Sequence, residues 1–345
     1  MREAKAPPAS TGLRVWYLTT GETGSRQQAR GLALELSPTA EERVVQVSRP
    51  WAALPARLTR LTLAGISEVE GRLAPPWPDV LVSCGRRAAL AAMAVRRRSG
   101  RPMVSVAIQP PPLPEAFDLV VAMAHDDLSG PNVTHIRTAL HGVRPSVLAA
   151  ARDLADPRFA SLPRPWTGVL LGGSTQRYRF TVEDADRLIS DLDALRAQTG
   201  GSLLITPSRR TPPEVIAALG WRYDGDPTVF LWDGVGPNPY LPILATADEL
   251  LVTSDSISMI SEALATQARV WIHSVAGGRR HLSFVAQLLE ERLVARVGDP
   301  APISRPNGVD ETERLAAIVR MLAVEKLGVA LPVLAPAQAD VAAVW

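Results

Sequence analysis

The sequence predicts an α/β protein made of two successive, doubly wound parallel-sheet domains. Its 345 residues exceed the usual size of one hydrophobic core, so two domains of about 150 residues each are expected. Short β-branched runs alternate with longer segments of helical period, which is the pattern of βαβ units. Prolines at positions 145, 157, 163 and 165 interrupt the alternation, which then starts again, and this indicates a linker between the domains.

In the first half, strands and helices follow one another from the first β-branched run onward. The first expected strand, Arg14 to Thr19, ends in Gly21-Glu22-Thr23-Gly24, after which Ser25 caps a helix running to Leu36. A second helix, Arg86 to Arg98, gathers arginines at its C-terminal end, where they suit the helix dipole. Further strands are expected at Arg43 to Val47, Val80 to Ser83, Met103 to Ala107, Phe117 to Val121 and Val133 to Ile136.

The second half repeats this order and closes with a helical segment. Strands are expected at Val169 to Leu171, Ser202 to Thr206, Val229 to Trp232, Glu249 to Thr253 and Val270 to His273. Helices are expected at Val182 to Gln198, Pro213 to Leu219, Ile257 to Thr266 and Leu282 to Leu289. The domains therefore span residues 14–150 and 165–310, after a disordered tail at residues 1–13. The last segment, 311–345, has one apolar helix face, and packing back onto the first domain is one solution for it.

The composition predicts a soluble, cytoplasmic protein. The apolar fraction is 46%, and no stretch approaches the roughly 18 apolar residues of a membrane span. The single cysteine, Cys84, excludes an internal disulfide and a thiolate metal cluster, and it is expected as a buried core residue. The histidines lack metal-ligand spacing, so no metal site is predicted.

The two halves differ in charge. The first 160 residues hold 20 Lys and Arg against 14 Asp and Glu, a net charge of +6, whereas the rest holds 17 against 21, a net charge of −4. A basic first half would favour an anionic or membrane-associated acceptor, with the protein peripheral at the membrane; an arginine-rich, solvated face explains the same excess and is the simpler reading. Nucleic-acid binding is not supported, because Arg96-Arg97-Arg98 has no interleaved aromatic residues.

The strongest candidate site follows the expected strand Glu249 to Thr253. In open parallel sheets, ligands bind beyond the carboxyl ends of the strands, where helix N-termini present unpaired amides. Ser254 and Ser256 stand where a helix begins and offer groups to a phosphate, and Glu262, about two turns along, can accept both hydroxyls of a ribose. The alternative is ordinary helix capping by Ser254 or Asp255, with Glu262 solvated.

Three more loops follow strands of the second half. Gly173 and Ser174 form a turn whose amides can face an anion, with Arg177 and Arg179 close behind. Ser208 can cap a short helix, and Arg209 can hold a phosphate in bidentate fashion. The loop containing Asn238 is rich in Gly and Pro and can wall a base or sugar pocket. Simple turns and exposed arginines remain the alternative for each loop.

The first half offers candidates for acid–base chemistry. Glu22 lies in the glycine turn after the first strand, and His125 and Asp126 follow the strand Phe117 to Val121. A histidine beside a carboxylate can act as a general base toward an acceptor hydroxyl, since its pKa lies near neutrality. Helix capping by Asp126 and an exposed His125 explain the same residues without catalysis.

Some of these segments resemble known families. The run from Thr253 to Ala263 resembles the donor-site motif of the GT-B glycosyltransferase superfamily, close to the Asp-Ser-(five residues)-Glu-Ala spacing of non-hydrolysing UDP-sugar 2-epimerases and the Ser-Glu of the peptidoglycan N-acetylglucosamine transferase. This resemblance implies that Ser256 touches a diphosphate and Glu262 a ribose. Where those epimerases have glycines after the serine, this chain has Ile257 and Ser258.

Taken in order, the segments resemble the mitochondrial-fission-protein family of plants and its bacterial relatives. The matching stretches are Trp16 to Gly31, Pro78 to Arg87, Phe117 to Asp126, Leu170 to Phe180, Thr206 to Pro213, Trp232 to Tyr240 and Thr253 to Ala265. The resemblance implies a GT-B-like fold, with two Rossmann-like domains facing a cleft. Plant relatives are linked with membrane division factors.

Three functions remain open. The first is a metal-independent glycosyltransferase-type enzyme that holds a nucleoside-diphosphate sugar as cosubstrate in the second domain and needs no cofactor. The second is a sugar-nucleotide epimerase, for which Glu22 and Asp126 are the available carboxylates. The third is a noncatalytic nucleotide-binding or scaffold protein related to mitochondrial fission factors.

Overall fold

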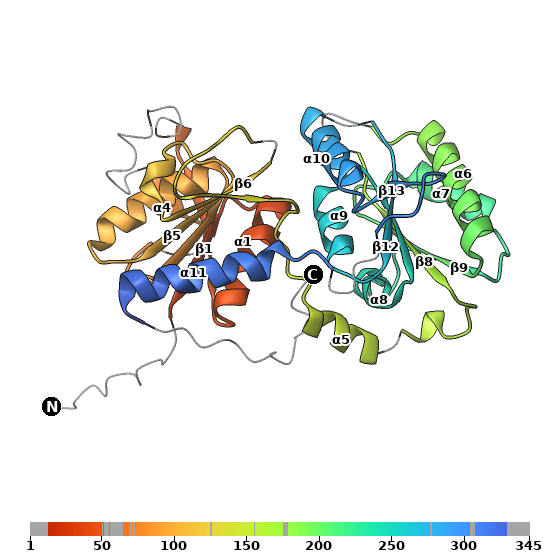
Figure 1. Ribbon diagram of the computed structural model, residues 1–345, viewed down its shortest axis with the longest axis horizontal. Helices are drawn as coiled ribbons and strands as arrows, with labels where there is room; N and C mark the ends of the chain where they lie inside the picture. Colours follow the sequence, from red (N-terminus) through yellow and green to blue (C-terminus); the bar gives the residue numbers. More distant parts are fainter. Residues whose placement is uncertain are drawn as a thin grey trace. The chain divides into compact units, whose positions relative to one another are not determined.

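A computed structural model of the protein describes most of the chain. The described residues are 13–49, 51, 55, 65–69, 71, 73–124, 126–154, 156–174, 179–276, 278–303 and 308–329. Residues 1–12 of the expected N-terminal tail, His125, Arg177 and the end of the 311–345 segment lie outside them, whereas Leu13, which was assigned to the tail, is buried in the core of the first unit. The described residues form two compact units (Figure 1), the first made of 13–136, 140–142 and 311–329 and the second of 137–139 and 143–310.

The first unit is built on a seven-stranded sheet of order β3-β2-β1-β4-β5-β6-β7. All pairs are parallel except β2 with β3, which is antiparallel. Its strands are β1 (Val15–Thr19), β2 (Glu41–Val47), β3 (Ile66–Glu68), β4 (Val80–Cys84), β5 (Val104–Ile108), β6 (Leu119–Met123) and β7 (Val133–Ile136). Its helices are α1 (Thr23–Leu36), α4 (Arg86–Ser99) and α11 (Glu311–Leu327), with a 3-10 turn at Pro114–Ala116.

Both faces of this sheet are covered by helices, so its central strands β1, β4 and β5 are buried throughout and mostly apolar. In β1, Val15 and Tyr17 face α1 and α11, whereas Trp16 and Leu18 face α4. A strand buried on both faces reads as a continuous hydrophobic run rather than an alternating one. This explains why β1, β4 and β5 are recognisable from the sequence.

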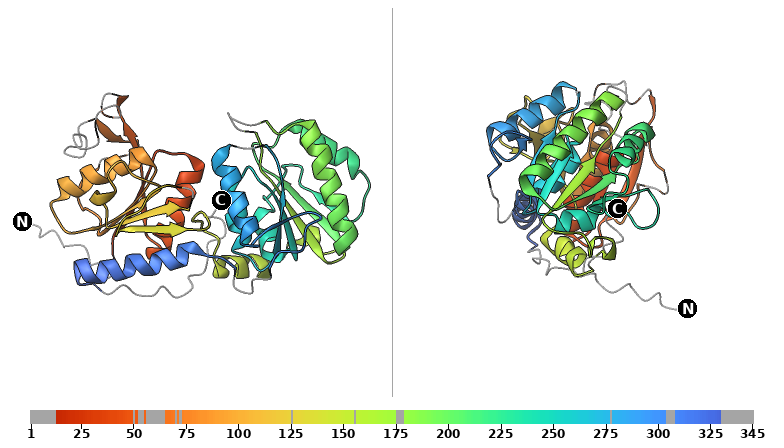
Figure 2. Two further views of the ribbon diagram at one scale, coloured as in Figure 1. Left: turned by 45° about the horizontal axis from the view of Figure 1, so that its top comes forward. Right: turned by 90° about the vertical axis from the view of Figure 1, so that its right-hand side faces the viewer.

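Helix α11 belongs to the first unit although it is the last described element. Figures 1 and 2 show it beside α1, and Leu315, Ala316 and Val319 lie in the same core as the strand residues of that face. Arg320 adds a polar contact, because its guanidinium donates to the backbone carbonyl of Glu35 at 2.6 Å.

The second unit is built on a six-stranded, all-parallel sheet of order β10-β9-β8-β11-β12-β13. Its strands are β8 (Trp166–Leu171), β9 (Ser202–Pro207), β10 (Val229–Leu231), β11 (Glu249–Thr253), β12 (Arg269–His273) and β13 (Ala295–Arg296). Its helices are α5 (Pro145–Asp153), α6 (Val182–Thr199), α7 (Pro213–Arg222), α8 (Tyr240–Thr246), α9 (Ile257–Leu264) and α10 (Arg279–Glu290), with a 3-10 turn at Pro157–Phe159.

Helices cover both faces of the second sheet as well. Leu188 and Leu192 of α6 and Val215 of α7 share one core with Val169 and Leu251 of the sheet. On the other face, α8 packs on β8, and α9 packs on β11 and β12. The predicted fold class of two Rossmann-like, doubly wound parallel-sheet domains is confirmed in these two units.

The structure divides the chain differently from the proline-based prediction. The stretch expected to begin the linker forms helix α5, with Pro145 in its first turn, and α5 packs on α8 in the second unit. Proline is well tolerated at the first helical position because its missing amide would have no intrahelical partner there. Pro145 was therefore interpreted as the start of a linker although it begins helix α5.

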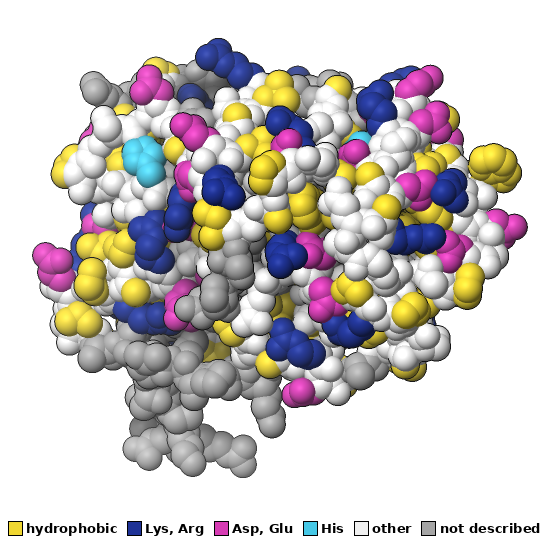
Figure 3. Space-filling view, turned by 45° about the vertical axis from the view of Figure 1, so that its right-hand side comes forward, with side chains coloured by type: hydrophobic (Ala, Val, Ile, Leu, Met, Phe, Trp, Pro, Cys, Tyr) yellow, Lys and Arg dark blue, Asp and Glu magenta, His cyan; other side chains and the backbone are white. Residues whose placement is uncertain are grey.

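Surface charge is mixed on the face drawn in Figure 3, where Lys and Arg side chains alternate with Asp and Glu rather than forming one basic patch. Among the described residues, no helix is both long enough and apolar enough to cross a bilayer.

Candidate functional site

The candidate site lies at the carboxyl ends of β8, β9 and β11 in the second unit. The chain leaves β8 toward β9 on one side, and later places β11 on the other side of β8, so the strand order reverses between β8 and β11. Open α/β sheets bind ligands beyond the strand ends at such a reversal, because the loops on either side diverge there. We define the candidate site as Gly172–Ser174, Ser208–Thr211 and Ser254–Ser256.

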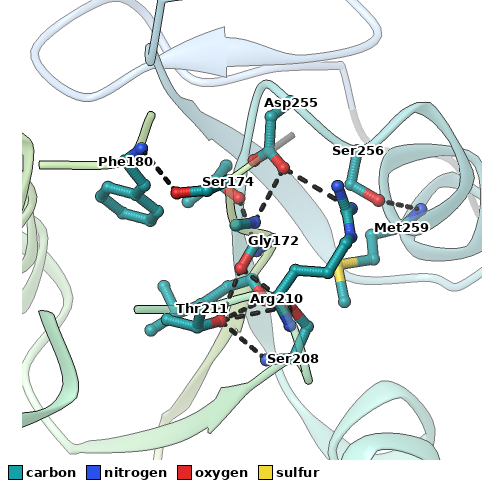
Figure 4. Close-up of polar contacts among 12 residues, drawn as sticks. Gly172, Ser174, Phe180, Ser208, Arg210, Thr211, Asp255, Ser256 and Met259 are labelled. Atoms are coloured by element: carbon teal, nitrogen blue, oxygen red, sulfur yellow. Dashed lines mark hydrogen bonds and ion pairs between the residues drawn. The ribbon is translucent and has the colours of Figure 1, made fainter. Parts of the chain in front are cut away.

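Hydrogen bonds join the three loops to one another (Figure 4). The Gly173 amide donates to Asp255 Oδ2 at 2.8 Å, and the Ser174 amide donates to the Arg210 carbonyl at 3.0 Å. The Ser208 hydroxyl donates to the Gly172 carbonyl at 2.8 Å. The structure therefore brings together the loops of Gly173, Ser208 and Ser256, as the sequence predicts for neighbouring strand ends.

These contacts differ from the sequence-based roles of Gly173, Ser174 and Ser208. The Gly173 and Ser174 amides were expected to face a ligand anion, and Ser208 was expected to cap a short helix. Instead, the two amides and the Ser208 hydroxyl donate to protein acceptors, and Pro212 is the N-cap of α7. The Ser174 hydroxyl accepts from the Phe180 amide at 3.0 Å. In this conformation these three residues hold the loops together.

The close approach of the loops explains the two glycines. A Cβ added at Gly172 would lie 2.2 Å from Asp255 Oδ2, and one added at Gly173 would lie 2.0 Å from the Arg210 carbonyl oxygen. No side chain fits at such distances, so only glycine allows the loop after β8 to pass between its neighbours.

The groups that face outward are the first turn of α9 and the side chain of Arg209. Ser256 is the N-cap of α9, and its hydroxyl accepts from the Met259 amide at 3.4 Å. The amides of Ile257 and Ser258 precede any intrahelical acceptor, and no described residue accepts a hydrogen bond from them. Arg209 is exposed and forms no hydrogen bond or ion pair with a described residue. A helix N-terminus beside a guanidinium suits an anion.

Ser254 was expected to offer a group to a phosphate, but its hydroxyl contacts the protein backbone instead. Its hydroxyl donates to the Val275 carbonyl at 3.2 Å and accepts from the Val275 amide at 2.9 Å. The residue is buried and ties the loop after β11 to the loop after β12. Ser256, rather than Ser254 or Asp255, caps the helix.

Glu262 lies two turns into α9 and is buried. The Tyr240 hydroxyl, from the start of α8, donates to its carboxyl oxygen Oε2. Burial raises the pKa of Glu262 to about 8 and raises that of Tyr240 well above its ordinary value. The carboxyl is therefore mostly protonated at neutral pH. Asn238 positions the same tyrosine, since its Oδ1 accepts from the Tyr240 amide at 3.0 Å.

The first unit places its candidates on separate strands. Glu22 is the exposed N-cap of α1, after β1, and the Thr20 hydroxyl donates to its carboxylate. Asp126 follows β6, and its Oδ2 accepts from the Met123 amide at 3.0 Å. Two strands, β4 and β5, lie between β1 and β6, so their ends are roughly 14 Å apart at strand spacings of about 4.8 Å. The strand order therefore does not favour a carboxylate pair of Glu22 and Asp126.

Neither the cysteine nor a metal site adds a reactive group among the described residues. Cys84 is buried, and burial raises the pKa of its thiol to about 12, so it is a core residue and not a nucleophile. In the described part of the chain, no three His, Cys, Asp or Glu side chains are placed to share a metal ion.

Sequence reasoning missed Asp255 and Thr211 as members of the site. Asp255 was considered only as a helix cap, yet its carboxylate joins the loop after β8 and lies 3.7 Å from Arg210 Nη2. The hydroxyl of Thr211 donates to the Gly172 carbonyl. The only available signal was that both residues stand within three positions of residues already singled out.

Comparison with known proteins identifies the family of the chain and two relatives. The sequence model of a family described as "Mitochondrial fission ELM1" matches residues 23–322. The mitochondrial fission protein ELM1 of Arabidopsis thaliana is 29% identical over 243 residues, which are 64% of this chain and 57% of that protein. An uncharacterized protein, RP120, of Rickettsia prowazekii (strain Madrid E) is 25% identical over 327 residues, which are 83% of this chain and 90% of that protein.

Solved structures similar to the chain include the UDP-GlcNAc 2-epimerase from Methanocaldococcus jannaschii, with 10% identity, a TM-score of 0.49 and coverage of 90% of this chain and 99% of that one. Another is UGT89C1 of Arabidopsis thaliana complexed with UDP, with 12% identity, a TM-score of 0.42 and coverage of 90% and 89%.

Proposed function

The chain belongs to the mitochondrial fission ELM1 family, and from this starting point we propose that it binds a nucleoside-diphosphate sugar in its second unit and acts as a metal-independent glycosyltransferase-type enzyme. The observation that carries this proposal is the reversal of strand order between β8 and β11, with three interlocked loops on its carboxyl side. Such a reversal is the position where nucleotides bind in doubly wound sheets.

The diphosphate would lie against the first turn of α9. There the Ser256 hydroxyl and the amides of Ile257 and Ser258 supply hydrogen bonds, and the positive end of the helix dipole favours negative charge. Arg209 would close the other side of the diphosphate as a charged donor. As the sugar is transferred, the same groups would stabilise the charge that develops on the leaving diphosphate.

Glu262 is proposed to recognise the ribose. Because the Tyr240 hydroxyl already donates to this carboxyl, a ribose would either share the carboxyl with Tyr240 or displace its hydroxyl. The protonated state favoured by burial also allows the Glu262 carboxyl to donate a hydrogen bond. Tyr240 and Asn238 would thus set the position of the recognising group.

Transfer is favoured over epimerisation by the spacing in the first unit. Epimerisation removes and returns a proton at one carbon and needs acid and base groups within reach of it. Glu22 and Asp126 stand at the ends of strands separated by two others, which does not suit such a pair. Glycosyl transfer needs only one base toward the acceptor hydroxyl, and Glu22, His125 or Asp126 would supply it.

Binding can be tested directly at Arg209. Isothermal titration with UDP, GDP and their glucose conjugates is expected to show binding by one base series, and Arg209→Ala is expected to weaken it roughly 10-fold, since a hydrogen bond to a charged group is lost. Arg222→Ala is the matched control, because it removes the same charge from the far end of α7. Failure of every nucleotide to bind the parent protein would contradict the proposal.

A noncatalytic nucleotide-binding protein is the second candidate function. It is favoured by the Gly173, Ser174 and Ser208 contacts, in which groups suited to a reacting phosphate are committed to holding the loops. The two candidate functions are separated by incubating the protein and an acceptor extract of membranes or proteins with the sugar nucleotide that binds, radiolabelled in its sugar. An enzyme releases nucleoside diphosphate, and Glu22→Ala or Asp126→Ala slows the release at least 10-fold. A binding protein gives no release, and both variants bind as the parent does.

A further inference from the structure

The carboxylate of Asp255 occupies the centre of the candidate site. Its Oδ2 accepts from the Gly173 amide at 2.8 Å and lies 3.7 Å from Arg210 Nη2, and its side chain is 4% exposed. Figure 4 shows it beside the loop after β8, with the Arg210 side chain of the loop after β9 reaching toward it. The loop after β8 is shaped around it, because any Cβ at Gly172 would lie 2.2 Å from the same oxygen.

These are the groups that an anion site offers. A glycine amide and a guanidinium facing one point usually receive a phosphate or a carboxylate from a ligand. Here they receive an anion that belongs to the protein. The other oxygen, Oδ1, is buried and has no hydrogen-bond partner among the described residues, so the negative charge of Asp255 is only partly compensated by its neighbours.

The remaining positive groups at the site are few. Arg209 is exposed and unpaired among the described residues, and the first turn of α9 supplies a partial charge. Arg210 is within ion-pair distance of Asp255 and so contributes less to a ligand. Asp255 adds one negative charge two residues before the start of α9. The site therefore matches a ligand of low negative charge.

We infer that Asp255 is a specificity-determining residue, which makes the proposed nucleotide site select nucleoside-diphosphate sugars over free nucleoside diphosphates and triphosphates; this inference rests on the proposed function. A diphosphate esterified at both ends carries two negative charges, whereas a free diphosphate carries about three and a triphosphate about four at neutral pH. Each added charge is repelled by the Asp255 carboxylate in a partly desolvated site.

The test is a charge series measured on the parent protein and on Asp255→Asn. Titration calorimetry is run with NDP-glucose, NDP and NTP of the base that binds, without divalent cations and at low ionic strength. The parent is expected to bind NDP-glucose most tightly and NTP most weakly. Asp255→Asn keeps the shape of the side chain and is expected to tighten NTP binding roughly 10-fold and NDP-glucose binding by much less.

Two further variants separate charge from structure. Asp193→Asn makes the same change of net charge on α6, where Asp193 pairs with Arg222, and is expected to leave all three affinities unchanged. Arg210→Ala added to Asp255→Asn is expected to cancel the gain, since the guanidinium released from Asp255 provides it.

The outcomes are distinct. If the parent binds NTP as tightly as NDP-glucose, or if Asp255→Asn changes all three affinities by one common factor, the inference is wrong and the nucleotide site stands. If Asp255→Asn does not fold, the inference is tested by the parent protein alone, which must bind NDP-glucose most tightly and NTP most weakly. If no nucleotide binds either protein, the proposed function itself fails.

Discussion

Replacing Glu262 with glutamine is expected to stabilise the protein at pH 8 by on the order of 4 kcal/mol and to leave its stability near pH 4.5 almost unchanged. Burial raises the pKa of the Glu262 carboxyl to about 8, from an ordinary value of 4.5. Below pH 4.5 the folded and unfolded states both carry the proton. Between pH 4.5 and 8 only the unfolded state releases it, so the free energy of unfolding falls as the pH rises. Glutamine has no such proton, and the fall disappears.

The measurement is urea-induced unfolding, followed by circular dichroism from pH 4.5 to 8.5. Asp226→Asn is the matched control, because hydrogen bonds from Thr228 lower the pKa of Asp226 to about 2. Its contribution to stability is constant across this range and is lost only as the pH falls toward 2. Asp226→Asn should therefore shift the curve without changing its slope. A Glu262→Gln curve that runs parallel to the parent curve would show that the pKa of Glu262 is not raised in the folded protein.

Gly173→Ala is expected to destabilise the protein by about 3 kcal/mol and to abolish nucleotide binding. The added Cβ would lie 2.0 Å from the Arg210 carbonyl oxygen and 2.5 Å from the Thr211 amide nitrogen. Both neighbours are backbone atoms, so no side chain can rotate to make room. The loop after β9 must shift and take Arg209 with it. Thermal unfolding and titration with the nucleotide that binds the parent measure the two effects.

Gly24→Ala gives the comparison for a glycine without neighbours. Nothing lies within 4 Å of a Cβ added there, and Gly24 is in the first turn of α1. Alanine is the better helix former, so this variant should be more stable by roughly 0.5–1 kcal/mol and should bind nucleotide normally. If Gly173→Ala unfolds at the temperature of the parent protein, the close packing of the site loops is refuted.

The larger elements of the fold could be predicted because each buries a full face. The predicted strand Glu249 to Thr253 matches β11 residue for residue, since every position in it is buried. Strands β3 and β13 were missed because two or three residues carry no periodicity. Helix α5 was missed because Pro145, which suits a first helical turn, also marks linkers.

The position of the candidate site in the fold could be predicted from the sequence, but the hydrogen bonds between its loops could not. The topology of a parallel sheet dictates that the loops of Gly173, Ser208 and Ser256 meet at one edge. Which acceptor the Gly173 amide finds depends on the packing distance between β8 and β11, which no local pattern records. For the same reason, the pairing of Glu262 with Tyr240, 22 positions away, was not anticipated.

The position of α11 has a consequence for biosynthesis. Most of the first unit leaves the ribosome before the second, yet one face of its sheet is completed by Leu315, Ala316 and Val319, which are translated after the second unit. Until then, the nascent chain exposes an apolar surface around Val15, Ala29 and Leu32, the kind of surface that chaperones recognise. A helix that is synthesised after the second unit thus completes the sheet of the first unit.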